Sequence, residues 1–517
     1  MNKYYLIAAL FAFALFAQTA LGQADPVIDQ IIQLGKTDNQ TMDHLDILSN
    51  RFGGRLIGSD AYENAAEWAA YEFHKWGMKV EMDETGELPI GFNRGPWFGK
   101  MLDTDGMHLH FTTPSYTAGT KGKQRGHVVM EPKTQREFDR MKGKLNGAWV
   151  LISGSNTGFP IDISEDADKY RDSLIADNLL ISEMNSEIGK TNRKAKKEKD
   201  KKEEQKLNDV PAIFYRQMVD AGILGIIQCA SLPIKAMYDR KNVNNMTWEN
   251  LPSTPDIKLD EHQYKIIEQK VKERQEVWLE FDIRNHFKMG PVRYHNVIGI
   301  IEGTEFPDEY VIMSAHLDAY DVATGGVDDG SGVCVMMEAA RLIMKAGGKP
   351  KRTILVTLWA GEEFGLLGSS SWIGRNPEKL EKISNMFNKD GGPTVPSHIS
   401  VSDAMWKDME QVCTPINAIN PDFPFEMRKR EARNRPERAW GTDSGPFAVA
   451  GVPTMSIRRS DPKGYDFDYY EIWHTERDLY NKSIPEYQNH ASIVYAIMVY
   501  GVANLDHLLS KEGYYLD

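Results

Sequence analysis

Three apolar segments in the C-terminal half of the chain each end in side chains that can bind a metal or transfer a proton. They are short and continuously apolar, as strands buried in a mainly parallel sheet are. Their polar ends are His316 after residues 310–315, Glu362 and Glu363 after residues 353–358, and Asp390 after residues 383–387. In open α/β sheets, ligands bind at the carboxyl ends of the strands. The pattern therefore predicts a site that several strands build together.

The alternation of strand and helix from about residue 277 predicts the fold class. We expect an α/β protein with a mixed, mostly parallel central sheet flanked by helices. The chain length of 517 residues fits one large domain that carries an insert. We predict a catalytic domain split between residues 23–115 and 286–517, and a smaller β-rich insert over residues 116–285.

The N-terminus has the layout of a secretory signal peptide. Lys3 precedes an apolar run over residues 4–17, and small residues at 20–22 offer a cleavage site before Gln23. We therefore predict a signal peptide over residues 1–22 and an exported protein without a stable membrane anchor. The alternative is an uncleaved N-terminal anchor, although the run is short for a membrane span, which needs about 20 apolar residues.

Charge and cysteine content exclude other classes of protein. The formal net charge is −13, so the chain lacks the basic character typical of nucleic-acid binding, and we expect no nucleic-acid partner. The three cysteines allow at most one disulfide, and their spacing matches no zinc–thiolate motif.

Histidine and carboxylate ligands without thiolates favour zinc in an open, catalytic site. Each motif alone also has a structural interpretation, such as a helix cap, a turn or a solvated acidic pair. An adjacent pair of glutamates directly after a buried strand is harder to explain in that way. A buried carboxylate is costly unless it is paired or bound to a metal. The set as a whole therefore favours a metal site.

The order of five motifs resembles that of the di-zinc exopeptidase family, which includes the bacterial leucyl aminopeptidases and carboxypeptidase Q. The motifs are HLD at 316–318, GVDDGSG at 326–332, AGEEFGLLGS at 360–369, FNKDG at 387–391 and HTERD at 474–478. The segment RFGGRLIGS at 51–59 resembles an N-terminal segment of the same family. The region 116–285 looks like the protease-associated insert that many members carry.

The resemblance implies two zinc ions per chain and a role for each matching residue. His316 and Asp390 would hold one ion, Glu363 and His474 the other, and Asp328 would bridge them. Glu362 would be the general base that takes a proton from a water between the metals. Asp318 and Asp478 would orient the two histidines, Asp329 would support the site, and the peptide bond Asp328–Asp329 would be cis, as in the family.

Four further residues are predicted on the substrate side. Asp443 competes with Asp390 for the last ligand position, and the FNKDG motif favours Asp390. Trp473 stands where several aminopeptidases of the family have a tyrosine that stabilises the oxyanion. Tyr469 and Tyr470 are the candidates to replace that tyrosine.

The resemblance implies an exported zinc-dependent exopeptidase that cleaves peptides near their free N-terminus. The alternative in the same class is a dipeptidase or carboxypeptidase like carboxypeptidase Q, which the similarity at 316–322 and at 441–443 supports. More remote alternatives are a glutaminyl cyclase and a non-catalytic receptor-like ectodomain, both disfavoured by the complete ligand set. The oligomeric state is left open, with a homodimer among the alternatives.

Overall fold

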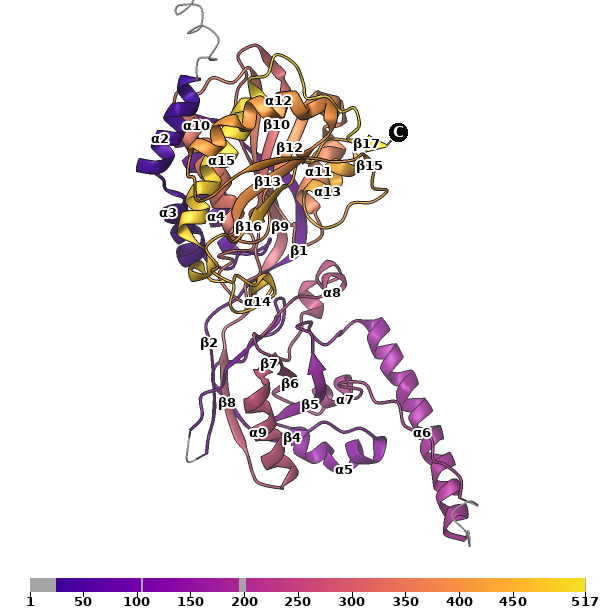
Figure 1. The fold of residues 1–517 in the computed structure, drawn as a ribbon. Helices are drawn as coiled ribbons and strands as arrows, with labels where there is room; N and C mark the ends of the chain where they lie inside the picture. Colours follow the sequence, from indigo (N-terminus) through magenta and orange to yellow (C-terminus); the bar gives the residue numbers. More distant parts are fainter. Residues whose placement is uncertain (1–24, 104–105, 195–200, 517) are drawn as a thin grey trace, which may run out of the picture.

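A five-stranded mixed sheet forms the centre of the larger domain (Figure 1). The computed structural model describes residues 25–103, 106–194 and 201–516. The strand order is β1-β9-β11-β10-β12, with β10 parallel to β11 and β12, and β9 antiparallel to β1 and β11. The strands are β1 (Lys79–Asn93), β9 (His286–Ile301), β10 (Phe306–His316), β11 (Arg352–Trp359) and β12 (Ile383–Asn388). The predicted mixed sheet in an α/β fold is confirmed.

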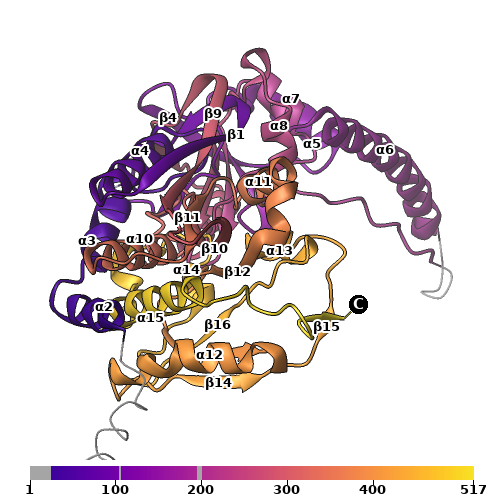
Figure 2. The ribbon, with the colours of Figure 1, turned by 90° about the horizontal axis from the view of Figure 1, so that it is seen from above.

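Helices cover both faces of this sheet (Figure 2). One face carries α2 (Pro26–Thr37), α3 (Thr41–Leu45), α4 (Asp60–Lys75), α10 (Gly330–Lys345) and α15 (Pro485–Ala503). The other carries α11 (Leu367–Arg375) and α13 (Ser444–Val449). Outside these layers lie α12 (Trp406–Cys413), α14 (Tyr469–Ile472), β13 (Val395–Val401), β14 (Glu426–Lys429), β15 (Arg433–Asn434), β16 (Ile457–Ser460) and β17 (Tyr515–Leu516).

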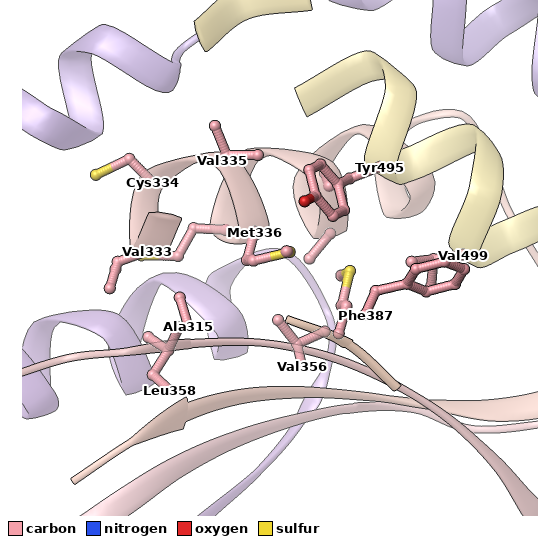
Figure 3. Packing of buried hydrophobic residues seen from close by; sticks show 14 of the residues in the cluster. Ala315, Val333, Cys334, Val335, Met336, Val356, Leu358, Phe387, Tyr495 and Val499 are labelled. Carbon is pink, nitrogen blue, oxygen red and sulfur yellow. The ribbon is translucent and has the colours of Figure 1, made fainter. Parts of the chain in front are cut away.

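Helix α10 is the most deeply buried helix against the sheet. Its residues from Gly330 to Ile343 are all buried, and the two charged ones among them, Glu338 and Arg341, form an ion pair with each other. Figure 3 shows Val335 and Met336 of this helix in the same cluster as Tyr495 of α15 and Val356 of β11. This packing fixes the start of α10, which follows directly after the predicted ligand Asp328.

A seven-stranded sheet forms the smaller domain, in the order β2-β8-β4-β5-β6-β7-β3. Its strands are β2 (Trp97–Met101), β3 (Phe111–Thr112), β4 (Gln124–Met130), β5 (Ala148–Asn156), β6 (Gly225–Ala230), β7 (Asp256–Asp260) and β8 (Trp278–Ile283). Its helices are α5 (Gln135–Leu145), α6 (Glu165–Lys194), α7 (Tyr215–Asp220), α8 (Arg240–Asn244) and α9 (Glu261–Lys272). The domain is therefore α/β in composition rather than simply β-rich.

The predicted start of the insert at residue 116 is too late for this sheet. Strands β2 and β3 lie before that residue, yet β2 pairs with β8 and β3 pairs with β7. At the other end, β8 finishes at Ile283 and β9 of the central sheet begins at His286.

The predicted signal peptide, residues 1–22, lies outside the described residues. Within the part of the chain that the structure describes, every helix is too short or too polar to cross a membrane.

Replacing Leu358 by alanine should lower the free energy of unfolding by about 2–5 kcal/mol, because the side chain lies fully buried in β11. The midpoint of urea unfolding measures this change. The matched control is Leu179→Ala on α6, where the side chain is 46% exposed and the expected change is within about 0.5 kcal/mol. Equal effects at the two positions would contradict the assignment of the core.

Candidate active site

The ends of three parallel strands bring the predicted ligands to one edge of the central sheet. His316 is the last residue of β10 and pairs in register with Trp359, the last residue of β11. On its other side, Ser314 of β10 pairs with Asn388, the last residue of β12. Glu362, Glu363 and Asp390 therefore leave the sheet at nearly the same level as His316.

Asp328 lies between two pairs of predicted ligands. Its Oδ1 is 3.3 Å from Nε2 of His316, and its Oδ2 is 3.8 Å from Nε2 of His474. His316 Nε2 is in turn 3.8 Å from Oδ1 of Asp390, and His474 Nε2 is 3.0 Å from Oε2 of Glu363. Each oxygen of one carboxylate thus faces a different histidine, which is the arrangement that a bridging ligand requires.

The donor atoms of this cluster are close enough to share cations. One atom each from His316, Asp328 and Glu363 lies within 4.8 Å of the others, and the same holds for His316, Asp329 and Asp390. Oε1 of Glu363 is buried and has no hydrogen-bond partner among the described residues. Zinc is commonly bound by histidine nitrogens and carboxylate oxygens, so this set of donors, with Oε1 of Glu363 unpaired, fits zinc.

The crowding of carboxylates also favours a cation. Burial raises the pKa of Glu363 well above its usual value, and the nearby Asp328 raises it further. For Glu362, burial again raises the pKa, His316 opposes the shift and Glu363 adds to it. A bound cation would lower the pKa values of the ligand carboxylates and hold them in their charged form.

Asp318 fixes the backbone of the glutamate pair. Its Oδ1 accepts a hydrogen bond from the N–H of Glu362 and its Oδ2 accepts one from the N–H of Glu363, both at 3.1 Å. We predicted that this carboxylate orients His316. Instead, Nδ1 of His316 lies 2.9 Å from the main-chain oxygen of Asp318, while the carboxylate is 3.8 Å away.

Asp478 has the same kind of contact with the loop of Asp328. Its Oδ1 accepts a hydrogen bond of 2.7 Å from the N–H of Val327, and its Oδ2 lies 3.3 Å from the N–H of Asp328. We predicted that Asp478 orients His474, but Nδ1 of His474 has no hydrogen-bond partner among the described residues. Both carboxylates therefore hold the main chain of ligand loops.

Asp329 supports the site from the start of α10. Its Oδ1 accepts a hydrogen bond from the N–H of Gly332, and its Oδ2 accepts one from the N–H of His316. Both of its oxygens are thus used by main-chain donors. The predicted cis peptide bond between Asp328 and Asp329 is present.

The four residues predicted on the substrate side have different surroundings. The hydroxyl of Tyr469 donates a hydrogen bond of 3.1 Å to Oδ2 of Asp328. The ring of Trp473 packs against that of His474, with centroids 4.4 Å apart. Asp443 is fully buried, accepts a 2.5 Å hydrogen bond from Ser369, and has its pKa raised to about 7 by burial. Tyr470 is 78% exposed.

Sequence reasoning missed two residues that shape the site. Arg55 is fully buried, and its guanidinium donates to the main-chain oxygens of Leu317, Thr324 and Gly325, which ties down the loop after His316. In the sequence, the only indication of its burial is that Arg55 directly precedes the apolar residues Leu56 and Ile57. Tyr238 of the smaller domain donates a 2.7 Å hydrogen bond to the main-chain oxygen of Glu363. The residues around Tyr238 in the sequence do not predict this contact.

Comparison with known proteins finds similarity to peptidases. Residues 296–498, which span the ligand-bearing strands and loops, match the model of Peptidase family M28. Carboxypeptidase Q of Rattus norvegicus is 30% identical over 234 residues, which cover 44% of this chain and 46% of the rat protein. The chain is thus aligned with about half the length of the curated relatives that it matches.

Two solved structures share the fold of nearly the whole chain. A peptidase M28 precursor from Shewanella amazonensis is 22% identical with a TM-score of 0.56, and the match covers 94% of this chain and 97% of the other. A zinc aminopeptidase from Bacillus subtilis is 17% identical with a TM-score of 0.51, covering 92% and 97%. At these identities the likeness concerns the fold.

Replacing Asp318 by asparagine should weaken zinc binding roughly 10- to 100-fold, because an amide cannot accept both N–H groups of the glutamate pair. Zinc content after dialysis against graded chelator concentrations measures the change. Asp403→Asn is the matched control, since this carboxylate is exposed and its ion pair is with Lys429 on the surface. Equal zinc retention in both variants would show that Asp318 does not support the site.

Proposed function

We propose that this protein is a zinc-dependent exopeptidase that hydrolyses peptide bonds near a free N-terminus. One observation carries the proposal: donors from four residues, His316, Glu363, Asp390 and His474, lie around Asp328, and Glu362 precedes Glu363 in the chain. The match of residues 296–498 to Peptidase family M28 supports peptides as the substrate class.

The residues present suit two zinc ions. His316 and Asp390 would hold one, Glu363 and His474 the other, and Asp328 would contact both through its two oxygens. Bound zinc would supply Lewis acidity, which polarises the scissile carbonyl and lowers the pKa of water.

Glu362 carries the proton transfer in this proposal. In its charged form, the Glu362 carboxylate can accept a proton from the attacking water and return one to the leaving amine. Tyr469 stays protonated, because burial and the nearby Asp328 raise its pKa. Its hydroxyl can donate to the oxygen on which negative charge develops once it exchanges its hydrogen bond to Asp328 for one to the substrate.

A second candidate function is that of a dipeptidase or carboxypeptidase. The sequence similarity to carboxypeptidase Q favours it, whereas the likeness to the Bacillus zinc aminopeptidase is one of fold. The complete set of ligands disfavours a glutaminyl cyclase and a non-catalytic ectodomain. Export through the predicted signal peptide and a homodimeric state remain predictions, which N-terminal sequencing of the mature protein and light scattering would test.

Replacing Glu362 by glutamine should reduce turnover roughly a hundred- to ten-thousandfold, because the amide cannot accept the proton. Zinc content should stay unchanged, since Glu362 is outside the predicted ligand set. Peptide hydrolysis and metal analysis on the same sample give both values. Full activity in this variant would mean that another group is the base.

Removing zinc should abolish hydrolysis, and adding zinc should restore it. Two substrate sets then separate the candidate functions: long peptides with free or blocked N-termini, and free dipeptides. Stepwise release of N-terminal residues from long, unblocked peptides supports the aminopeptidase, and cleavage confined to dipeptides supports the second candidate. Absence of zinc-dependent hydrolysis across both sets would contradict the proposed function.

A further inference from the structure

A short segment of the smaller domain pairs directly with the loop that carries His474. Lys235 forms a β-bridge with Thr475, the N–H of Ala236 donates to the main-chain oxygen of His474, and the N–H of Glu476 donates to that of Ile234. The position of Lys235 is thus set by the same loop that positions a predicted zinc ligand.

Two further contacts fix the side chain of Lys235. Its ammonium lies 4.0 Å from the centroid of the Trp473 ring, and that ring also packs against His474. On the other side, a Cβ atom at Gly158 would lie only 2.9 Å from Cγ of Lys235 and 3.0 Å from its main-chain oxygen. Gly158 has a φ of +102°, which side-chain-bearing residues rarely adopt, so this close approach depends on glycine.

The ammonium of Lys235 has no carboxylate partner among the described residues, although the neighbouring site is rich in carboxylates. The side chain is half-buried, and this loss of solvent lowers its pKa. A half-buried cation is more stable beside an anion. Its surroundings therefore favour a negatively charged ligand that arrives from outside the chain.

We propose that Lys235 binds the carboxylate of the amino acid that leaves when the peptide bond is cleaved. The inference rests on the proposed peptidase function and names the substrate feature that the site selects. One residue of extended chain spans about 3.5 Å, so the carboxylate of a dipeptide must be recognised close to the ligands. The Lys235 ammonium and the His474 imidazole both contact the Trp473 ring, at 4.0 Å and 4.4 Å from its centroid, so Lys235 lies close enough to the predicted ligands to meet this condition.

A binding experiment tests the proposal without relying on turnover. Zinc-loaded protein with Glu362→Gln is titrated by calorimetry with alanyl-alanine, alanyl-alanine amide and alanyl-glutamic acid α-amide. Alanyl-alanine has a C-terminal carboxylate, alanyl-alanine amide has no carboxylate, and alanyl-glutamic acid α-amide has a carboxylate only in its side chain. Each is measured with Lys235 intact, with K235M, with K235R and with K265M, a control lysine that pairs with Glu261 on the surface of α9.

With Lys235 intact, at least one carboxylate-bearing dipeptide should bind roughly tenfold more tightly than alanyl-alanine amide, because a charge-assisted hydrogen bond is lost with the amide. K235M should remove this difference, K235R should retain most of it, and K265M should leave it unchanged. K235M keeps an apolar stem against Trp473, so thermal unfolding should confirm that it folds.

Equal binding of all three dipeptides with Lys235 intact, or a preference that survives K235M, would overturn the proposal. Uniform weakening of all three by K235M would assign Lys235 a packing role only and would also overturn it. In each of these cases hydrolysis by the unmutated enzyme leaves the peptidase function standing. If the unmutated, zinc-loaded protein hydrolyses no peptide, the proposed function fails and the role of Lys235 fails with it.

Discussion

Mutual repulsion among buried carboxylates is the constraint on which the site depends. Asp318, Asp328, Asp329 and Asp478 are all buried, and Glu363 keeps an oxygen without a hydrogen-bond partner. Such a cluster is stable only if its negative charge is met by hydrogen-bond donors or cations. Asp318, Asp329 and Asp478 accept hydrogen bonds from main-chain N–H groups. The carboxylate oxygens of the predicted ligands instead face one another and two histidines.

This division explains how the sequence positions the ligands. Each supporting carboxylate accepts hydrogen bonds from the main chain of a loop that carries a ligand, so these contacts help to hold the shape of the loops. Arg55 adds a buried cation that ties the loop after His316 through three main-chain oxygens. The register of the strands determines where the ligands lie along the sheet, and the supporting carboxylates determine the main-chain conformation of the loops.

The central part of this arrangement was predictable because it is local in the sequence. His316, Glu363 and Asp390 each follow an apolar strand, and the register of parallel strands brings such ends together. The partners of Asp318 and Asp478 were not predictable, since a carboxylate can accept from an imidazole or from main-chain N–H groups. The contacts of Lys235 and Tyr238, and the early start of the smaller sheet at β2, depend on pairing between residues far apart in the chain, which no local pattern encodes.

We propose that two zinc ions share Asp328. Anomalous diffraction at the zinc edge, from crystals of the zinc-loaded protein, would locate them. We expect two peaks, one next to His316 and Asp390 and one next to Glu363 and His474, with Asp328 in contact with both. A single peak, or zinc bound elsewhere with these five side chains free of metal, would contradict it.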